Sequence, residues 1–90
     1  MKEARKLSDL ASVGPATLKD FEVLGIKSVS QLARSNPKSL YKKLCEKTGQ
    51  RHDICVLDVF SATVAQAKDP KLPKEKCNWW YWSRIRKQQD

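Results

Sequence analysis

The sequence predicts an all-α protein, a compact bundle of five to six short helices. Two observations indicate this class: apolar residues recur at helical spacing, and Gly, Pro, Ser and Asn stand where helices begin or end. The chain has 90 residues, enough for one domain with a modest core but not for two. We therefore expect a single domain over residues 1–90.

The first two expected helices flank a tight turn at residues 12–15. An apolar stripe marks the first helix: Ala4, Leu7, Leu10 and Ala11. Pro15 begins the second helix, because its missing N–H costs nothing at that position. This helix runs to Leu24, and Gly25 follows where a left-handed conformation favours glycine. The segment 4–26 is thus a helical hairpin.

Two further helices have similar boundary signals. Ser28 and Gln31 have capping-box spacing and open a helix of one or two turns through Ala33. Asn36 followed by Pro37 predicts the start of the next helix, which Gly49 ends. Residues 53–68 are apolar on nearly all sides. A strand is compatible with residues 54–60, but the length of the run favours a buried helix.

The end of the chain is divided into a linker and a tail. Residues 70–77 form the linker, because two prolines disfavour a helix there. Residues 78–90 form a Trp- and Arg-rich tail, in which Asn78 caps a last helix from Trp79 to about Lys87.

The net charge is +8, which favours polyanionic partners through steering and counterion release. Half of this charge lies in residues 70–90, where two acidic residues oppose six basic ones: Lys71, Lys74, Lys76, Arg84, Arg86 and Lys87. A Lys-rich surface can also serve solubility alone. Charge by itself therefore favours nucleic acid only weakly.

The hairpin carries the most specific signal for a binding site. The backbone N–H groups of Gly14, Ala16 and Thr17 lie at a helix N-terminus, where the helix dipole also attracts an anion. Gly14 lacks a Cβ and so permits close approach. The Thr17 hydroxyl and the Lys19 ammonium add a donor and a charge. These groups predict a phosphate site that reads no base sequence.

The stretch from Leu10 to Ile26 resembles the helix-hairpin-helix motif of DNA-repair proteins, which grips the phosphates of one strand. Val13 and Gly14 match the motif's second hydrophobic-Gly pair. Ser12 replaces the motif's first glycine, and Ala16 stands where the motif often has Lys or Arg. The alternative is a structural corner that needs Gly and Pro only for packing.

The resemblance extends along residues 5–82, through Leu24–Leu32, Asn36-Pro37, Leu40-Tyr41, Cys45 to Phe60 and Trp79–Trp82. In these features the chain resembles the bacterial pathogenicity-locus family, some members of which are labelled mitomycin resistance proteins. The resemblance implies a cytoplasmic bacterial protein with a DNA-binding-like helical fold. It implies little about activity.

Only one hairpin of this kind is present. The second half, around residues 46–51, has one glycine and lacks the hydrophobic-Gly-hydrophobic-Gly pattern. A single hairpin with two to four phosphate contacts predicts weak, salt-dependent binding. Tight binding then needs a homodimer or a protein partner.

The tail contains the densest aromatic cluster of the chain, residues 79–82. Trp side chains with Arg84 and Arg86 could stack on exposed bases. The alternative, which we favour, is that Trp79 and Trp82 fold the tail back over the bundle. One or two rings at most then stay exposed.

Catalytic and metal sites are not indicated. Four side chains could ligate zinc, but their spacing matches no common zinc motif: Cys45, His52, Cys55 and Cys77. His52 is expected at the surface or at a helix cap, and Asp58 on a solvated face or paired with Lys or Arg. We expect no enzyme, no metal and no cofactor.

The sequence has no apolar run of membrane-spanning length and no secretory h-region near residue 1. An odd number of cysteines fits a reducing compartment, so we expect a cytoplasmic protein. The predicted function is sequence-independent DNA binding, and the alternative is a protein-interaction module without DNA binding. The candidate nucleic-acid contacts are Ser12, Val13, Gly14, Ala16, Thr17, Lys19, Arg84 and Arg86.

Overall fold

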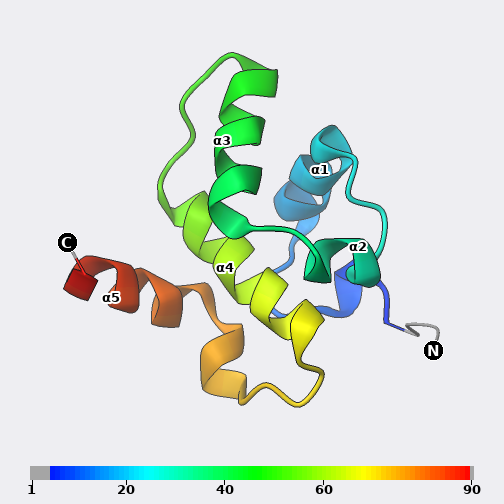
Figure 1. Cartoon of the computed structure of the whole chain (residues 1–90), viewed down its shortest axis with the longest axis vertical. Coiled ribbons are helices and arrows are strands. Elements are labelled where there is room, and N and C mark those ends of the chain that lie inside the picture. The colour runs from blue at the N-terminus through cyan, green and yellow to red at the C-terminus, as the bar shows by residue number, and fades with distance from the viewer. Residues whose placement is uncertain (1–4, 90) are drawn as a thin grey trace.

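The structure is a computed structural model that describes residues 5–89, with the backbone alone for Gln89. Within this range the chain forms five α-helices, two 3-10 turns and no strand (Figure 1). The helices are α1 (Pro15–Leu24), α2 (Val29–Ala33), α3 (Pro37–Thr48), α4 (Cys55–Lys68) and α5 (Trp79–Gln89), and the turns are η1 (Leu7–Asp9) and η2 (Lys74–Cys77). The all-α prediction is confirmed.

Most predicted helix boundaries are confirmed. They could be predicted because residues within one turn of each boundary determine it. Gly25 and Gly49 follow α1 and α3 in the left-handed conformation, with φ of 76° and 69°. Ser28 accepts the amide of Gln31 through its hydroxyl. The Gln31 side chain in turn accepts the amide of Lys27 through its Oε1, whereas a capping box predicts the amide of Ser28.

Helix α4 crosses the middle of the molecule, with α1, α2 and α3 on one side and η2 and α5 on the other (Figure 1). Phe60 of α4 stacks on Phe21 of α1 with ring centroids 5.7 Å apart, and both side chains are fully buried. Leu32 and Leu44 complete the centre of the core. Burial on several sides explains the nearly continuous apolar run of α4.

The prediction of a first helix, before the turn at residues 12–15, is wrong. Residue 4 lies outside the described residues, and the rest of the stretch forms only the turn η1. Asp9 accepts the amide of Lys6 and closes this turn locally. Leu10 then adopts an extended conformation and is buried in the core. Burial of one leucine thus overrides a helical preference that a stretch this short supports poorly.

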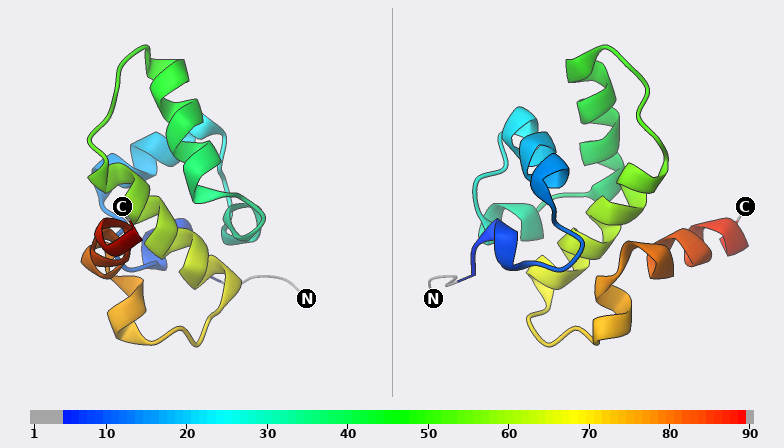
Figure 2. Two further views of the ribbon diagram at one scale, coloured as in Figure 1. Left: turned by 60° about the vertical axis from the view of Figure 1, so that its left-hand side comes forward. Right: turned by 180° about the vertical axis from the view of Figure 1, so that it is seen from behind.

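The predicted linker 70–77 also contains structure. Pro73 precedes η2, and its carbonyl accepts the amide of Lys76. The tail that follows forms α5, which leaves the bundle at an angle to α4 and reaches outward (Figure 2).

One buried side chain joins the segment before α1 and the end of η2 to α4. Gln66 is 6% exposed; its Oε1 accepts the amide of Ala11 at 2.9 Å. Its Nε2 donates to the carbonyl oxygens of Ala11 at 2.9 Å and Cys77 at 3.3 Å. A buried amide needs such partners, so this network fixes the segment before α1 and the end of η2 together.

None of the helices within residues 5–89 has the length and apolar character that a bilayer crossing requires.

Candidate nucleic-acid interface

The helical hairpin predicted over residues 4–26 has only its second helix, α1, because residues 7–9 form only the turn η1. From here on, the hairpin means residues 10–17, the turn that precedes α1 together with the first residues of that helix. Ser12 adopts the left-handed conformation, with φ of 69°. This conformation is uncommon for a residue other than glycine, and Ser12 stands where the helix-hairpin-helix motif has its first glycine. Gly14 instead has an extended backbone, with φ of −110°. The residue with glycine-like geometry is therefore Ser12.

The side chain of Ser12 connects the hairpin to the tail. Its hydroxyl donates to the carbonyl oxygen of Cys77 at 3.0 Å and accepts the amide of Trp79 at 3.2 Å. Figure 2 shows the segment before α1 passing the start of α5. Both hydrogen bonds of the Ser12 hydroxyl are therefore made to other residues of the chain. They help to hold Ser12 in a backbone conformation that is costly for serine.

Gly14 is not required to be glycine by the described fold. Its backbone angles are open to any residue, and a Cβ built there would meet nothing within 4 Å. The position is therefore open toward the outside of the molecule.

The start of α1 leaves backbone donors available. Gly14 is the N-cap and has no side chain to accept a hydrogen bond. The first α1 amide with an acceptor among the described residues is that of Leu18, which donates to Gly14 at 3.0 Å. The amides of Ala16 and Thr17 precede it, at the positive end of the helix dipole.

Charged groups follow on the same helix. Lys19 is exposed. Burial raises the pKa of Asp20, and the charges of His52 and Lys19 oppose that rise. Lys19 is the cation nearest to the hairpin in the sequence.

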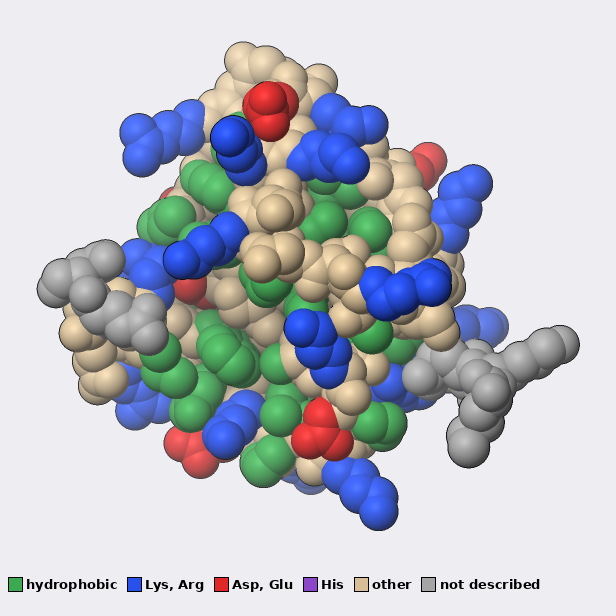
Figure 3. Space-filling view, in the orientation of Figure 1, with side chains coloured by type: hydrophobic (Ala, Val, Ile, Leu, Met, Phe, Trp, Pro, Cys, Tyr) green, Lys and Arg blue, Asp and Glu red, His purple; other side chains and the backbone are tan. Residues whose placement is uncertain are grey.

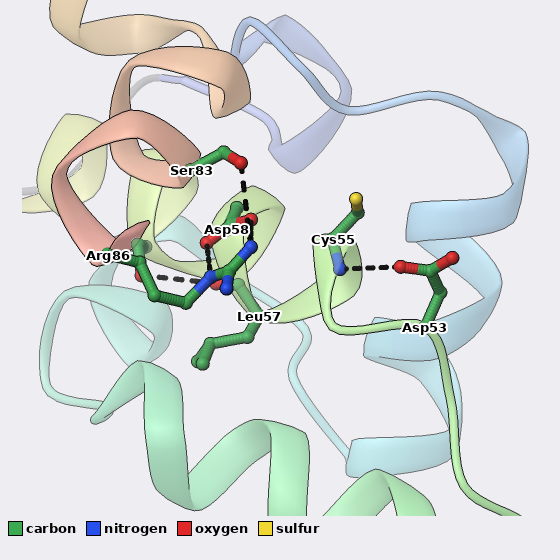
Figure 4. Close-up of polar contacts among 7 residues, drawn as sticks. Asp53, Cys55, Leu57, Asp58, Ser83 and Arg86 are labelled. Atoms are coloured by element: carbon green, nitrogen blue, oxygen red, sulfur yellow. Dashed lines mark hydrogen bonds and ion pairs between the residues drawn. The ribbon is translucent and has the colours of Figure 1, made fainter. Parts of the chain in front are cut away.

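Arg86 lies at a different place from the one that its predicted role requires. Its Nε and Nη2 donate to the two carboxylate oxygens of Asp58, each at 3.0 Å, and Figure 4 shows it pointing from α5 onto α4. Asp58 is 1% exposed, so this bidentate pair fixes α5 on α4. The prediction that Asp58 pairs with Lys or Arg is confirmed. Arg86 is left out of the interface proposed below.

The aromatic cluster divides into a packed part and an exposed part. Trp82 donates its Nε1–H to the carbonyl of Lys76 at 2.7 Å and meets Tyr81 edge-on. Trp79 and Trp80 are 40% and 47% exposed. The predicted packing of the tail over the bundle is wrong for Trp79, whose backbone rather than ring is held by Ser12. Trp82 is half-buried and contacts η2 and its own helix, and it is not among the side chains packed against the core.

Basic side chains are distributed over the face that Figure 3 shows and do not form one stripe. The structure does bring one basic segment to the hairpin, because η2 carries Lys74 and Lys76 and ends at Cys77, which is bonded to Ser12. Arg84 lies further along α5, with its guanidinium carbon 5.2 Å from the centroid of the Trp80 ring.

Known proteins include relatives of this chain. The profile of the Cdd1 family, described as pathogenicity locus, matches residues 1–88. The chain belongs to the pathogenicity-locus family. It is 36% identical over 81 residues to a Streptomyces lavendulae protein named mitomycin resistance protein McrB, across 90% of this chain and 73% of that protein. No solved structure matches this family member.

The four candidate zinc ligands of this pathogenicity-locus chain are not brought together: Cys45 and His52 are in contact, and Cys55 and Cys77 have other partners. The Cys45 sulfur accepts the amide of His52 at 3.5 Å, and the His52 ring is bonded to Thr48. A hydrogen bond to Asp53 raises the pKa of Cys55, and burial raises the pKa of Cys77. Among residues 5–89, no three His, Cys, Asp or Glu side chains are placed to hold a metal.

Sequence reasoning on this pathogenicity-locus chain missed a cleft of about 640 Å³ between the start of α3, α4 and α5. Ile54, Leu57, Trp82 and Ile85 form its apolar walls, and the pair of Asp58 and Arg86 lies among them. Figure 3 shows hydrophobic side chains on this side of the molecule, toward α5. The cleft depends on the angle at which α5 leaves α4, and no sequence signal encodes that angle.

Proposed function

We propose that the chain binds DNA without reading its sequence, by donating backbone N–H groups at the start of α1 to phosphate oxygens. The observation that carries the proposal is the open N-terminus of α1. Gly14 is a glycine that neither its backbone angles nor internal packing require, and the amides of Ala16 and Thr17 follow it. Such groups bind phosphate through hydrogen bonds and the helix dipole.

The charge of the chain supports this role. The net charge of +8 attracts a polyanion. Lys19 lies close to the hairpin in the sequence, on α1. Lys74 and Lys76 lie on η2, whose last residue, Cys77, is bonded to Ser12 of the hairpin. The role we propose is binding, not catalysis. The name of the relative concerns mitomycin resistance, and we propose no resistance activity for this chain.

A second candidate function is a protein-interaction module without DNA binding, for a partner protein or a second copy of the chain. Exposed apolar side chains favour it: Leu18 and Val23 of α1 are 36% exposed, and Ile54, Trp79 and Trp80 are 39% to 47% exposed. The distributed basic residues in Figure 3 also favour it. Sedimentation of the purified protein measures the self-association that a homodimer requires.

Fluorescence anisotropy of labelled DNA, titrated from about 50 to 200 mM salt, tests the first proposal. Two to four phosphate contacts predict a log–log slope of about −2 to −4. Gly14→Val adds bulk in front of the open amides and should weaken binding about tenfold, the equivalent of one lost hydrogen bond to a charged group.

Ser30→Val is the matched control, because it adds bulk at an exposed position of α2. Circular dichroism should show both variants folded. Absence of DNA binding at about 50 mM salt, or equal binding by Gly14→Val and wild type, overturns the proposal and leaves the interaction module.

A further inference from the structure

The start of α5 is an exposed aromatic surface held beside the hairpin. The amide of Trp79, the first residue of α5, donates to Ser12, two residues before Gly14. The side chains of Trp79 and Trp80 are the most exposed large hydrophobic groups among the described residues. By contrast, Trp82 and Tyr81 are partly buried.

A cation lies over the ring of Trp80. The Arg84 guanidinium carbon lies 5.2 Å from the ring centroid, within the range of a cation–π interaction. Arg84 is exposed, so the pair offers a flat aromatic group and a positive charge on the same part of α5.

The surroundings of this surface indicate the chemistry of its partner. Lys74 and Lys76 precede it on η2 and are exposed, and Glu75 is the one acidic residue within residues 74–84. A polymer with flat apolar bases and negative phosphates fits this combination, because bases stack on Trp and phosphates pair with Lys and Arg.

We propose that Trp79, Trp80 and Arg84 stack on unpaired bases of the DNA strand whose phosphates the hairpin holds. This inference rests on the proposed function and names its substrate class as single-stranded or forked DNA. Bases inside a duplex are covered by their neighbours on both faces, so only unpaired or terminal bases reach the two rings.

The distances along the chain allow one strand to reach both places. Ser12 is four residues from Ala16, the first of the open amides, which corresponds to at most about 14 Å between Cα atoms. About four nucleotides cover that distance at roughly 3.4 Å for each nucleotide of a strand. A strand on the hairpin therefore reaches the start of α5 within a few bases.

The test compares three labelled DNAs of equal length at fixed salt: a single strand, a fork and a blunt duplex. Wild type should bind the single strand and the fork about tenfold more tightly than the duplex, which is the effect of one stacked base. The variant Trp79→Ala/Trp80→Ala should lose this preference and keep its duplex affinity within about twofold. Val23→Ala, which shortens an exposed apolar side chain at the end of α1, should keep the preference.

An abasic single strand provides the second control, because it keeps the phosphates and lacks the bases. Wild type should bind it no better than it binds the duplex. Equal affinity of wild type for single strand and duplex overturns this inference and leaves the proposed function, whereas absence of binding to all three DNAs overturns both. Self-association that the double Trp variant abolishes, with an unchanged DNA preference, assigns the surface to a second copy and also overturns the inference.

Discussion

Helices α1 and α3 both begin with proline, yet their first amides have different partners. At the start of α3, the Asn36 side chain accepts the amides of Lys38 at 2.9 Å and Ser39 at 3.3 Å. At the start of α1, the N-cap is Gly14, which has no side chain that could do the same. The chain thus completes one helix start from within and leaves the other for solvent or a ligand.

The largest expected effect concerns the tail, which Ser12 holds beside the start of α1. Arg86→Ala leaves the buried carboxylate of Asp58 without its bidentate partner. We expect a loss of about 3 kcal/mol in the free energy of unfolding, measured by urea denaturation. The variant Asp58→Leu/Arg86→Leu should regain most of it, because no buried charge is left unpaired. A loss below about 1 kcal/mol, typical of a surface pair, contradicts the role given to this pair.

The next effect makes α1 begin as α3 does. Gly14→Asp places a carboxylate where it can accept the amides of Ala16 and Thr17 and repel phosphate. We expect DNA affinity in the anisotropy assay to fall at least about tenfold, while the unfolding free energy rises by about 0.5 kcal/mol.

Asn36→Asp is the matched control for Gly14→Asp. It makes the same change in net charge at the start of α3 and keeps a good N-cap. We expect less than about a twofold change in DNA affinity from this control. If Gly14→Asp and Asn36→Asp lose the same amount of DNA affinity, the effect comes from net charge. The start of α1 then has no DNA-binding role that the start of α3 lacks.

The smallest effect concerns α4, which begins with a third arrangement. The Asp53 carboxylate accepts the amide of Cys55 at 2.9 Å (Figure 4), and this bond lowers the pKa of Asp53 below its ordinary value of 3.8. The stabilisation is therefore complete above pH 3.8 and is lost as pH falls through the lower pKa of the folded state.

Asp53→Asn retains an acceptor oxygen and removes the titration. The melting temperature of wild type should fall more steeply with pH below 3.8 than that of this variant. Parallel melting curves for the two proteins over that acid range contradict the assignment of the bond to the ionised carboxylate.

The helix boundaries could be predicted where the determinants are a few residues apart. Asn36, Gly25 and Gly49 act within one turn, and each ends or begins its helix as expected. The absence of a helix before residue 12 could not be predicted, because burial of Leu10 depends on residues far along the chain.

The candidate site was predictable only in its local part. The glycine at position 14 and the open amides after it follow from the sequence pattern alone. The pairing of Arg86 with Asp58 joins residues 28 apart, and the bonds of Ser12 join residues more than 60 apart. Such contacts depend on how the helices pack, so the sequence could not separate Arg86 from Arg84 or Trp79 from Trp82.

The bonds of Gln66 determine how the molecule comes apart. One side chain serves both Ala11 and Cys77, so loss of either segment leaves buried hydrogen-bonding capacity without a partner. Opening the chain at one end therefore lowers the cost of opening it at the other. We therefore expect the segment before α1 and the end of η2 to open together, although they lie more than 60 residues apart in the sequence.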